Sequence, residues 1–305
     1  MRALVTGAAG FVGRHIVAEL VERGWTVTPV DLIHGEDCLD LFRTDTTRYD
    51  LAVHCAAVVG GRACIDGSPL SVGTNLALDA WYFRWLERSR TPRAVYFSSS
   101  AVYPVALQTA SIHRVSTWHQ VAPVRALTSG RRLVEDDVDF SLMGRPDQTY
   151  GFGKLAGEVL ARYAEETGTR VTIARPFSGY SEMQPLDYPF PSFVDRAQRH
   201  ADPFDIWGDG EQVRDWVHIS DVVAGTLAAV EQDVQGPVNL CTGRATSFNE
   251  LAKLVTEAAG YSPGFRHLTA KPSGVQYRVG DPAKLHTLYT PRVSLEEGIR
   301  RALAG

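Results

Sequence analysis

A tyrosine and a lysine four residues apart, Tyr150 and Lys154, are the residues of this chain best suited to catalysis. On a helix this spacing places both side chains on one face, one turn apart. A lysine ammonium near a phenol favours the phenolate, so the pair can take the proton of an alcohol while a cofactor takes the hydride. Most such pairs belong to ordinary helix surface, so this interpretation depends on the rest of the chain.

A glycine-rich turn near the N-terminus predicts a bound dinucleotide. A short apolar run ends at Gly7, Gly10 and Gly13 follow, an amphipathic helical pattern spans 11–21, and a second apolar run ends at Asp31. This order indicates a βαβ unit with the glycines in its first strand-to-helix turn. Gly7 permits the tight turn, Gly10 lets the backbone approach a pyrophosphate, and Gly13 lets helix and strand pack closely. The pyrophosphate would lie at the helix N-terminus.

The carboxylate of Asp31 favours NAD over NADP. It can accept hydrogen bonds from the adenosine ribose hydroxyls and would repel a 2′-phosphate. No lysine or arginine follows it in residues 32–37. The alternative is an ordinary solvent-exposed aspartate at the end of a strand.

Three serines, Ser98, Ser99 and Ser100, follow an apolar run at 94–97. The carboxyl edge of an open parallel sheet is where ligands bind, so these serines are candidate contacts to a reacting carbonyl or hydroxyl. The alternative is a capping or turn cluster, which serines often form.

The composition is that of an ordinary soluble globular protein with 305 residues, 44% of them hydrophobic and 22% charged. A net charge of -4 gives no indication of a nucleic-acid partner. No apolar run approaches the roughly 18 residues of a membrane helix, and no signal peptide fits the N-terminus. The cysteines lack metal-ligand spacing, which predicts no metal site and reduced thiols in a cytoplasmic protein; they are Cys38, Cys55, Cys64 and Cys241.

With these features in order, the chain resembles an extended short-chain dehydrogenase/reductase of the NAD-dependent nucleotide-sugar epimerase/dehydratase family. The resemblance covers essentially the whole chain. Besides the glycine turn, it rests on the stretches 98–103, 150–158, 175–177, 206–210, 214–222 and 239–243. It implies an α/β fold, with a Rossmann-type doubly wound parallel sheet and a smaller C-terminal α/β substrate lobe. The NAD-binding domain would comprise residues 1–175 and 215–241, and the substrate-binding lobe 176–214 and 242–305.

The resemblance also implies residue roles. Tyr150 is the catalytic acid/base, Lys154 is its partner and holds the nicotinamide ribose, and Ser99 hydrogen-bonds the sugar oxygen being oxidised. Further cofactor contacts are Gly7, Gly10, Phe11, Val12, Gly13, Asp31, Asp37, Cys38, Ala56, Ala57, Asn75, Ser98 and Pro176. Substrate contacts are Ser99, Ser100, Tyr150, Ser178, Arg214, Lys271 and Arg278.

Within that set, Arg214 matches the arginine that grips the diphosphate, which suits a guanidinium fork. Its alternative role is a salt bridge between lobes to Asp209 or Asp215. Lys271 or Arg278 would supply a second cation for the diphosphate.

Departures from the family pattern narrow the expected chemistry. The Asp-Glu pair of family 4,6-dehydratases is replaced by Ser100 and Ala101. The cysteine used for epimerisation at C3 and C5 is also replaced by Ala101, and Cys55 and Cys64 lie in the wrong segment. Ser178 takes the place of a usual asparagine, which puts that ligand contact in doubt.

A stretch of about two dozen extra residues, Val105–Gly130, separates two catalytic segments. It contains Arg114, Trp118, His119 and Arg125. A loop there could order over bound nucleotide sugar and exclude water, and the alternative is a packing or linker segment.

The sequence therefore predicts an NAD-dependent epimerase acting at C4 of a nucleotide-linked sugar through a transient 4-keto intermediate. Alternatives within the family are a nucleotide-sugar decarboxylase, a 4-ketoreductase or an atypical dehydratase. An alternative of another class is a non-catalytic NAD-binding regulator or scaffold. The resemblance, together with the abundant apolar and aromatic residues of the helix at 69–88, predicts a homodimer through helices 69–88 and 150–166.

Overall fold

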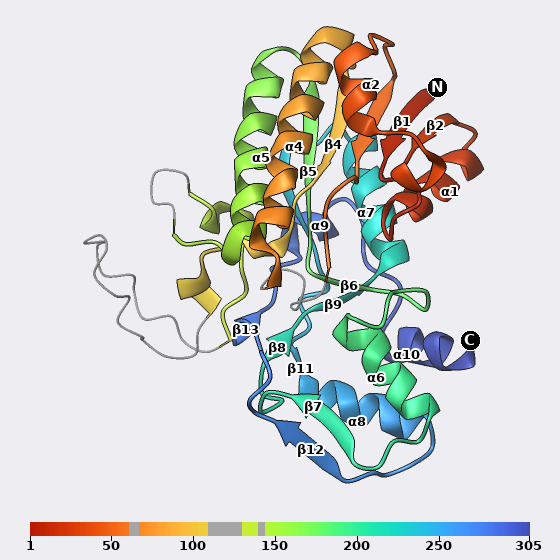
Figure 1. Cartoon of the computed structure of the whole chain (residues 1–305), viewed down its shortest axis with the longest axis vertical. Coiled ribbons are helices and arrows are strands. Elements are labelled where there is room, and N and C mark those ends of the chain that lie inside the picture. The colour runs from red at the N-terminus through yellow and green to blue at the C-terminus, as the bar shows by residue number, and fades with distance from the viewer. Residues whose placement is uncertain (61–66, 109–129, 140–143) are drawn as a thin grey trace.

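The computed structural model describes residues 1–60, 67–108, 130–139 and 144–305. A six-stranded parallel sheet organises the larger lobe, in the upper half of Figure 1. Its order is β10-β5-β4-β3-β1-β2, so the strand sequence reverses between β1 and β3. Ligands bind beside such a switch point, at the carboxyl ends of the strands. The strands are β1 (Arg2–Thr6), β2 (Thr26–Val30), β3 (Leu51–His54), β4 (Arg93–Phe97), β5 (Arg170–Pro176) and β10 (Gly236–Leu240).

Helices cover both faces of this sheet because successive residues of each strand point to opposite sides. In β1, Ala3 and Val5 pack in one hydrophobic cluster with α1 (Gly13–Glu22) and α7 (Ile219–Glu231). Leu4 belongs to the opposite cluster, with α2 (Cys38–Thr44), α4 (Pro69–Ser89) and α5 (Gln148–Glu166). The predicted doubly wound α/β fold is therefore confirmed.

The aromatic side chains of α4 are used mostly inside the chain. Tyr82 and Trp85 are fully buried, and their rings pack against the Phe42 ring of α2. The support that the aromatic residues of this helix give to the predicted homodimer is weakened to that extent. Large hydrophobic side chains that stay exposed on these helices are Leu70 and Leu76 of α4, by 90% and 38%, and Phe152 and Tyr163 of α5, by 52% and 61%.

The smaller lobe has its own hydrophobic cluster, built around Phe190, Phe204 and Leu251. Its helices are α6 (Pro189–Gln198), α8 (Phe248–Ala258) and α10 (Leu295–Ala304), at the bottom and lower right of Figure 1. Short strands pair as β11-β8-β13, β12-β7 and β6-β9; they are β6 (Ser178–Tyr180), β7 (Phe204–Trp207), β8 (Val213–Arg214), β9 (Trp216–His218), β11 (Thr246–Ser247), β12 (Phe265–Leu268) and β13 (Tyr277–Arg278).

One segment that we expected in the smaller lobe returns to the sheet. Leu285, on the short helix α9 (Ala283–His286), is buried in the first cluster of the larger lobe, and Tyr289 packs against it. The Lys284 ammonium donates to the Pro237 carbonyl at the start of β10, at 2.6 Å. Hydrophobic contact with β10 and α7 thus decides the position of this segment.

Cys64 lies outside the described residues. Residues 109–129, which make up most of the expected insertion, also lie outside them. Of that insertion, Val105–Gln108 forms a 3₁₀ turn. In the ranges that the structure describes, none of the helices is both long and apolar enough to cross a bilayer. No cluster of three metal-ligating side chains occurs in those same ranges.

Candidate active site

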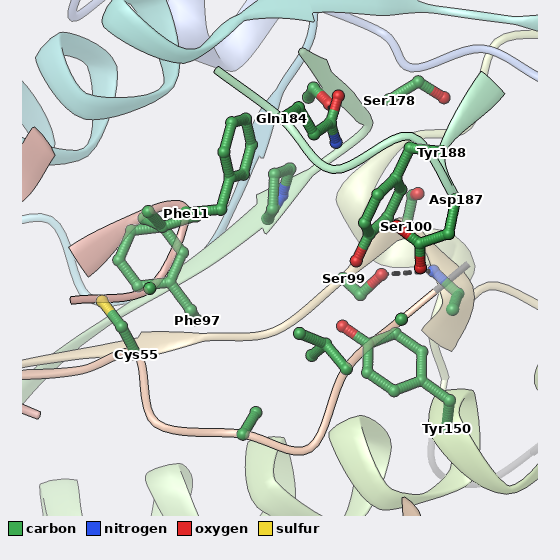
Figure 2. A pocket seen from close by; sticks show the side chains of 18 of the residues that line it. Phe11, Cys55, Phe97, Ser99, Ser100, Tyr150, Ser178, Gln184, Asp187 and Tyr188 are labelled. Carbon is green, nitrogen blue, oxygen red and sulfur yellow. Dashed lines mark hydrogen bonds between the residues drawn. The ribbon is translucent and has the colours of Figure 1, made fainter. Parts of the chain in front are cut away.

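A cavity of about 830 Å³ lies at the carboxyl edge of the sheet and extends to the smaller lobe. Residues from the glycine turn, from the ends of β2, β3, β4 and β5, and from α5, α6 and β8 line it. All the predicted site residues except Asn75 and Lys271 are among the lining residues. Figure 2 shows the part of this cavity where Ser99 and Tyr150 meet.

The glycine turn is shaped by two close backbone approaches, at Gly7 and at Gly13. Gly7 has a φ of +67°, and a Cβ there would lie 2.5 Å from the backbone nitrogen of Ala56, after β3. A Cβ on Gly13 would lie 2.0 Å from the Gly7 carbonyl oxygen. A side chain at Gly7 would therefore push the turn away from the segment after β3, and one at Gly13 would push α1 away from the turn. The resulting concave backbone at the start of α1 fits the pyrophosphate of a dinucleotide.

Asp31 connects that turn to the end of β2. Its Oδ2 accepts from the Ala9 amide at 2.9 Å, and its Oδ1 accepts from the Ile33 amide at 3.0 Å. The side chain is half-buried and lines the cavity. Since a carboxylate has about four lone-pair sites, two backbone bonds leave capacity for ribose hydroxyls. The geometry agrees with both the expected cofactor contact and a local capping role.

Asp37 and Cys38 line the far end of the cavity, where adenine is expected. The Asp37 carboxylate caps α2 by accepting from the Leu39 amide at 2.8 Å. Burial raises the pKa of the Cys38 thiol to about 11, with a further contribution from the Asp37 charge. Cys38 therefore stays a neutral thiol and offers an apolar surface.

Asn75 differs from its expected role. It is 2% exposed and is not among the lining residues. Its Oδ1 accepts from the Val58 amide at 2.6 Å, and its Nδ2 donates to the Val58 carbonyl at 2.9 Å. Val58 itself lines the cavity. Asn75 thus fixes the loop after β3, and that loop contacts the cavity.

Ser99 and Tyr150 lie together at one end of the cavity, which we call the reacting end, although they are 51 positions apart in the sequence. Their hydroxyl groups point into the same space in Figure 2. Ser99 Oγ accepts from the Ala101 amide at 3.1 Å, so the serine caps the 3₁₀ turn Ser100–Val102 and can still donate its hydroxyl hydrogen. Lys154, one turn along α5, is only 4% exposed and also lines the cavity.

A buried ion pair fixes α5 behind the reacting end. Arg175 Nε donates to Glu158 Oε1 at 2.8 Å, and Arg175 Nη2 donates to Glu158 Oε2 at 2.7 Å. The Ser98 hydroxyl also donates to Glu158. Burial works against the Arg175 charge, yet Glu158 and Tyr103 raise its pKa above the usual arginine value. Ser98 therefore contacts the cavity with its hydroxyl directed toward the protein.

Arg214 lies in the wall of the substrate side. Its Nη1 donates to the Val213 and Val275 carbonyls at 2.8 Å, and its Nη2 donates to the Ser273 carbonyl at 3.2 Å. The guanidinium also lies 5.6 Å from the centre of the Phe248 ring. These contacts hold it at the cavity wall. The carboxylate of neighbouring Asp215 instead accepts hydrogen bonds from the Thr242, Gly243 and Gly280 amides.

The other two predicted cations differ from Arg214. Arg278 lines the cavity, but its Nη2 donates to Asp147 at 2.8 Å and its Nε donates to Gln108. Its charge is thus largely offset within the protein. Lys271 is exposed outside the cavity, with its ammonium 5.4 Å from the centre of the Trp207 ring. The expectation that Lys271 contacts the diphosphate therefore lacks support from this arrangement.

Several lining residues were not predicted. Asp187 and Tyr188, in the loop between β6 and α6, point toward Ser99 and Tyr150 in Figure 2. Arg196 of α6 lines the cavity with its guanidinium 5.5 Å from the centre of the Phe193 ring. The helical spacing of Phe193 and Arg196 places them on one face, but no local signal shows that this face meets a ligand cavity.

Cys55 also lines the cavity, at the end of β3. Burial raises its pKa to about 12, although the Lys154 charge acts in the opposite direction. The thiol therefore stays protonated, which agrees with the expectation that it does not replace the missing cysteine of enzymes that epimerise at C3 and C5.

Comparison with known proteins extends these observations. Residues 3–241 match the model of the NAD dependent epimerase/dehydratase family. The chain is 27% identical to GDP-mannose 3,5-epimerase 1 of Oryza sativa subsp. indica, over 98% of this chain and 80% of the relative. It superposes on MoeE5 in complex with UDP-glucuronic acid and NAD with a TM-score of 0.79 and 26% identity, covering 100% and 98% of the two chains. Its fold also superposes on that of Thermus thermophilus UDP-glucose 4-epimerase in complex with NAD, with a TM-score of 0.78 and 23% identity. This superposition covers 100% of this chain and 98% of the epimerase.

The match extends from the glycine turn to the end of β10, and so includes the tyrosine, lysine and serine of the reacting end. The turn, the carboxylate after β2 and the cavity between the lobes provide the features needed to bind NAD. We conclude that this chain is an enzyme of the NAD-dependent epimerase/dehydratase family, whose relatives act on nucleotide-linked sugars.

Proposed function

We propose that the protein epimerises a nucleotide-linked sugar at C4 through a transient 4-keto intermediate. The observation that supports this most is the meeting of the Ser99 and Tyr150 hydroxyls in one cavity beside the Lys154 side chain. With NAD as the hydride carrier, this set can handle the proton and the oxygen when a secondary alcohol is oxidised or its ketone is reduced. The residues expected for elimination across C5 and C6, or for epimerisation at C3 and C5, are replaced by Ser100 and Ala101.

Each residue has a defined part in this reaction. The Tyr150 phenolate takes the proton of the sugar 4-hydroxyl, and the Lys154 ammonium favours that phenolate. Ser99 donates to the same sugar oxygen and steadies it as the carbonyl forms. When bound, NAD would supply the hydride acceptor for the oxidation at C4 and the hydride donor for the reduction of the ketone. Tyr150 then gives its proton back to the oxygen.

The exchange of faces requires the sugar to turn while its diphosphate stays bound. Arg214 suits that anchoring role because three backbone carbonyls hold its guanidinium at the wall. A guanidinium fork binds phosphate oxygens in a defined orientation. The sugar itself would lie between Ser99 and the loop that carries Asp187 and Tyr188.

A second candidate is the same oxidation followed by a further acid/base step, such as decarboxylation or elimination. One observation favours it: Asp187 and Tyr188 bring a carboxylate and a phenol toward the reacting end. In this case Asp187→Asn would stop product formation and leave the oxidation of the sugar intact. In the epimerase, the same substitution would affect substrate affinity and leave the type of product unchanged.

The experiment is incubation of the purified protein and NAD with a panel of nucleotide sugars, followed by proton NMR. UDP-glucose and UDP-glucuronic acid come first because MoeE5 has been solved with both. We expect the C4 epimer of one panel member and none from the Tyr150→Phe variant. Absence of sugar oxidation with every panel member would favour a non-catalytic NAD-binding protein.

We also propose a homodimer through α4 and α5. These helices pack together on one side of the sheet, and Leu76 and Phe152 remain exposed there. Sedimentation analysis is expected to give a dimer that a Leu76→Asp/Phe152→Asp double variant converts to a monomer. A wild-type monomer at micromolar concentration would contradict the proposal.

A further inference from the structure

A group of buried polar side chains lies beside Lys154 and takes no part in the proposed reaction. Asp79 of α4, Tyr96 of β4 and His54 of β3 are each at most 1% exposed. None of the three is among the residues that line the cavity. Buried polar and charged groups are costly unless they are paired, so each of them requires a reason.

The group is connected by short contacts. The Tyr96 hydroxyl donates to Asp79 Oδ2 at 2.6 Å. Asp79 Oδ1 lies 3.3 Å from His54 Nε2, and His54 Nδ1 lies 2.7 Å from Thr6 Oγ1. The arrangement depends on α5 lying close to the sheet: a Cβ on Gly157 would lie 2.0 Å from the Tyr96 hydroxyl oxygen.

Lys154 lies at one end of this group. Its ammonium is 5.1 Å from the centre of the Tyr96 ring, the distance of a cation–π contact. The hydroxyl of the same tyrosine donates a hydrogen bond to Asp79. The tyrosine thus connects a buried carboxylate to the lysine that stands beside the reacting end.

The charges of these groups are complementary. Burial alone would raise the pKa of Asp79, but the Lys154 charge and the contacts with His54 and Tyr96 hold it below its usual value. Burial lowers the pKa of His54, which therefore stays neutral near neutrality. Burial raises the pKa of Tyr96, which stays a hydrogen-bond donor. Lys154 is then the cation that balances the Asp79 carboxylate.

Among the residues that the structure describes, other titratable groups nearby do not supply that balance. Glu158, one turn beyond Lys154, is engaged by both nitrogens of the Arg175 fork. The described titratable groups that face Asp79 and Lys154 come from four elements of the larger lobe. They are His54 of β3 and Cys55 directly after it, Tyr82 of α4, Tyr96 of β4, and Tyr150 and Glu158 of α5.

We propose that Asp79 is a positioning residue that acts through Lys154: its buried carboxylate, oriented by Tyr96, keeps the lysine in its ammonium form beside Tyr150. This inference rests on the proposed role of Lys154, but its main test requires neither substrate nor turnover. Asp79→Asn is the suitable variant because asparagine keeps an oxygen for the Tyr96 hydroxyl and removes the charge.

The test is an NMR titration of lysine labelled with ¹³C at Cε, in the full chain with NAD bound. The chain has only four lysines, namely Lys154, Lys253, Lys271 and Lys284. Lys154→Met identifies the resonance of interest. We expect its titration midpoint to lie at least about one pH unit lower in Asp79→Asn than in the wild type, since the buried ammonium has lost its counter-charge.

Asp221→Asn is the matched control. Asp221 is also 1% exposed and also accepts from a tyrosine hydroxyl at 2.6 Å, that of Tyr289 on the opposite face of the sheet. It should lower stability and leave the Lys154 midpoint unchanged. An unchanged midpoint in Asp79→Asn, or an equal shift in Asp221→Asn, overturns the proposal.

Tyr96→Phe decides the matter if Asp79→Asn does not fold. It keeps the ring under Lys154 and removes the hydroxyl that orients Asp79, so a smaller shift of the midpoint to lower pH is expected. No shift in that variant also overturns the proposal. Where activity is measurable, Asp79→Asn should lower kcat about tenfold at neutral pH, move the alkaline limb of the kcat profile to lower pH, and leave KM unchanged.

Discussion

The two sides of the cavity are built in different ways. On the cofactor side, glycines, short side chains and backbone groups at the ends of β1, β3 and β4 form the surface, and buried polar pairs such as Glu158–Arg175 support it from behind. On the substrate side, long side chains from separate segments form the surface, among them Arg196, Trp207 and Arg214.

This difference separates a surface that is shaped by the sheet and its turns from one that is shaped by individual side chains. The cofactor side is rigid because its shape follows from the parallel sheet and from turns in which a Cβ would clash. The substrate side can change through single side-chain replacements that leave the sheet intact. Mutations on the two sides should therefore have different consequences.

The largest effect is expected for stability on the cofactor side. Glu158→Ala leaves the Arg175 guanidinium buried without its carboxylate, which should lower the free energy of unfolding by about 3–5 kcal/mol. Urea denaturation measures this. Asp205→Ala removes the partner of Arg266 from an exposed ion pair in the smaller lobe and should change stability little. Equal effects of the two substitutions would contradict the comparison.

Tyr150→Phe should separate chemistry from binding. We expect turnover to fall by at least about a hundredfold, the usual scale for loss of an acid/base group. Folding and NAD affinity should stay near normal because the ring keeps its place. Retention of activity within a factor of a few would remove Tyr150 from the mechanism.

Arg214→Ala should weaken nucleotide-sugar binding by about 1.5–3 kcal/mol, the range for a hydrogen bond to a charged group. NAD binding should not change. Arg278→Ala is the comparison, with a smaller expected loss because Asp147 already offsets the Arg278 charge. Calorimetry gives both values, and a normal substrate Kd in Arg214→Ala would show that this arginine is structural.

Asp31 should give the smallest effect, on cofactor choice. We expect NAD to bind at least about tenfold more tightly than NADP, and Asp31→Ser to reduce that ratio because the carboxylate no longer repels a 2′-phosphate. Equal affinity of the wild type for the two cofactors would mean that Asp31 serves only its backbone contacts with Ala9 and Ile33.

The sequence predicts the cofactor side well because its signals are local. The order of strand, glycine turn and helix is sufficient to place Gly7, Gly13 and Asp31, and the four-residue spacing places Tyr150 and Lys154 on one face of α5. The parallel sheet then brings the Ser99 segment beside them.

The substrate side is predicted less well because it depends on tertiary contacts. Arg278 has the charge suited to a diphosphate, but only the fold shows that Asp147, 131 positions earlier, pairs with it. Asn75 is a polar residue next to the site, and its backbone contacts with Val58 are equally invisible in the sequence. Asp187 and Tyr188 lie in a segment without periodicity, and no local pattern places them near Ser99.

The most direct test of the proposed C4 epimerisation is to run the reaction in D₂O and analyse the product by NMR. The substrate is a nucleotide sugar that the enzyme converts in the panel experiment. In a C4 epimerase the hydrogen removed from C4 returns to C4, so the product should be the C4 epimer with no deuterium on any ring carbon. Decarboxylation, elimination across C5 and C6, and epimerisation at C3 or C5 each require a proton exchange at carbon. Deuterium at C3 or C5 of the product, or loss of carbon dioxide, would contradict the proposed function.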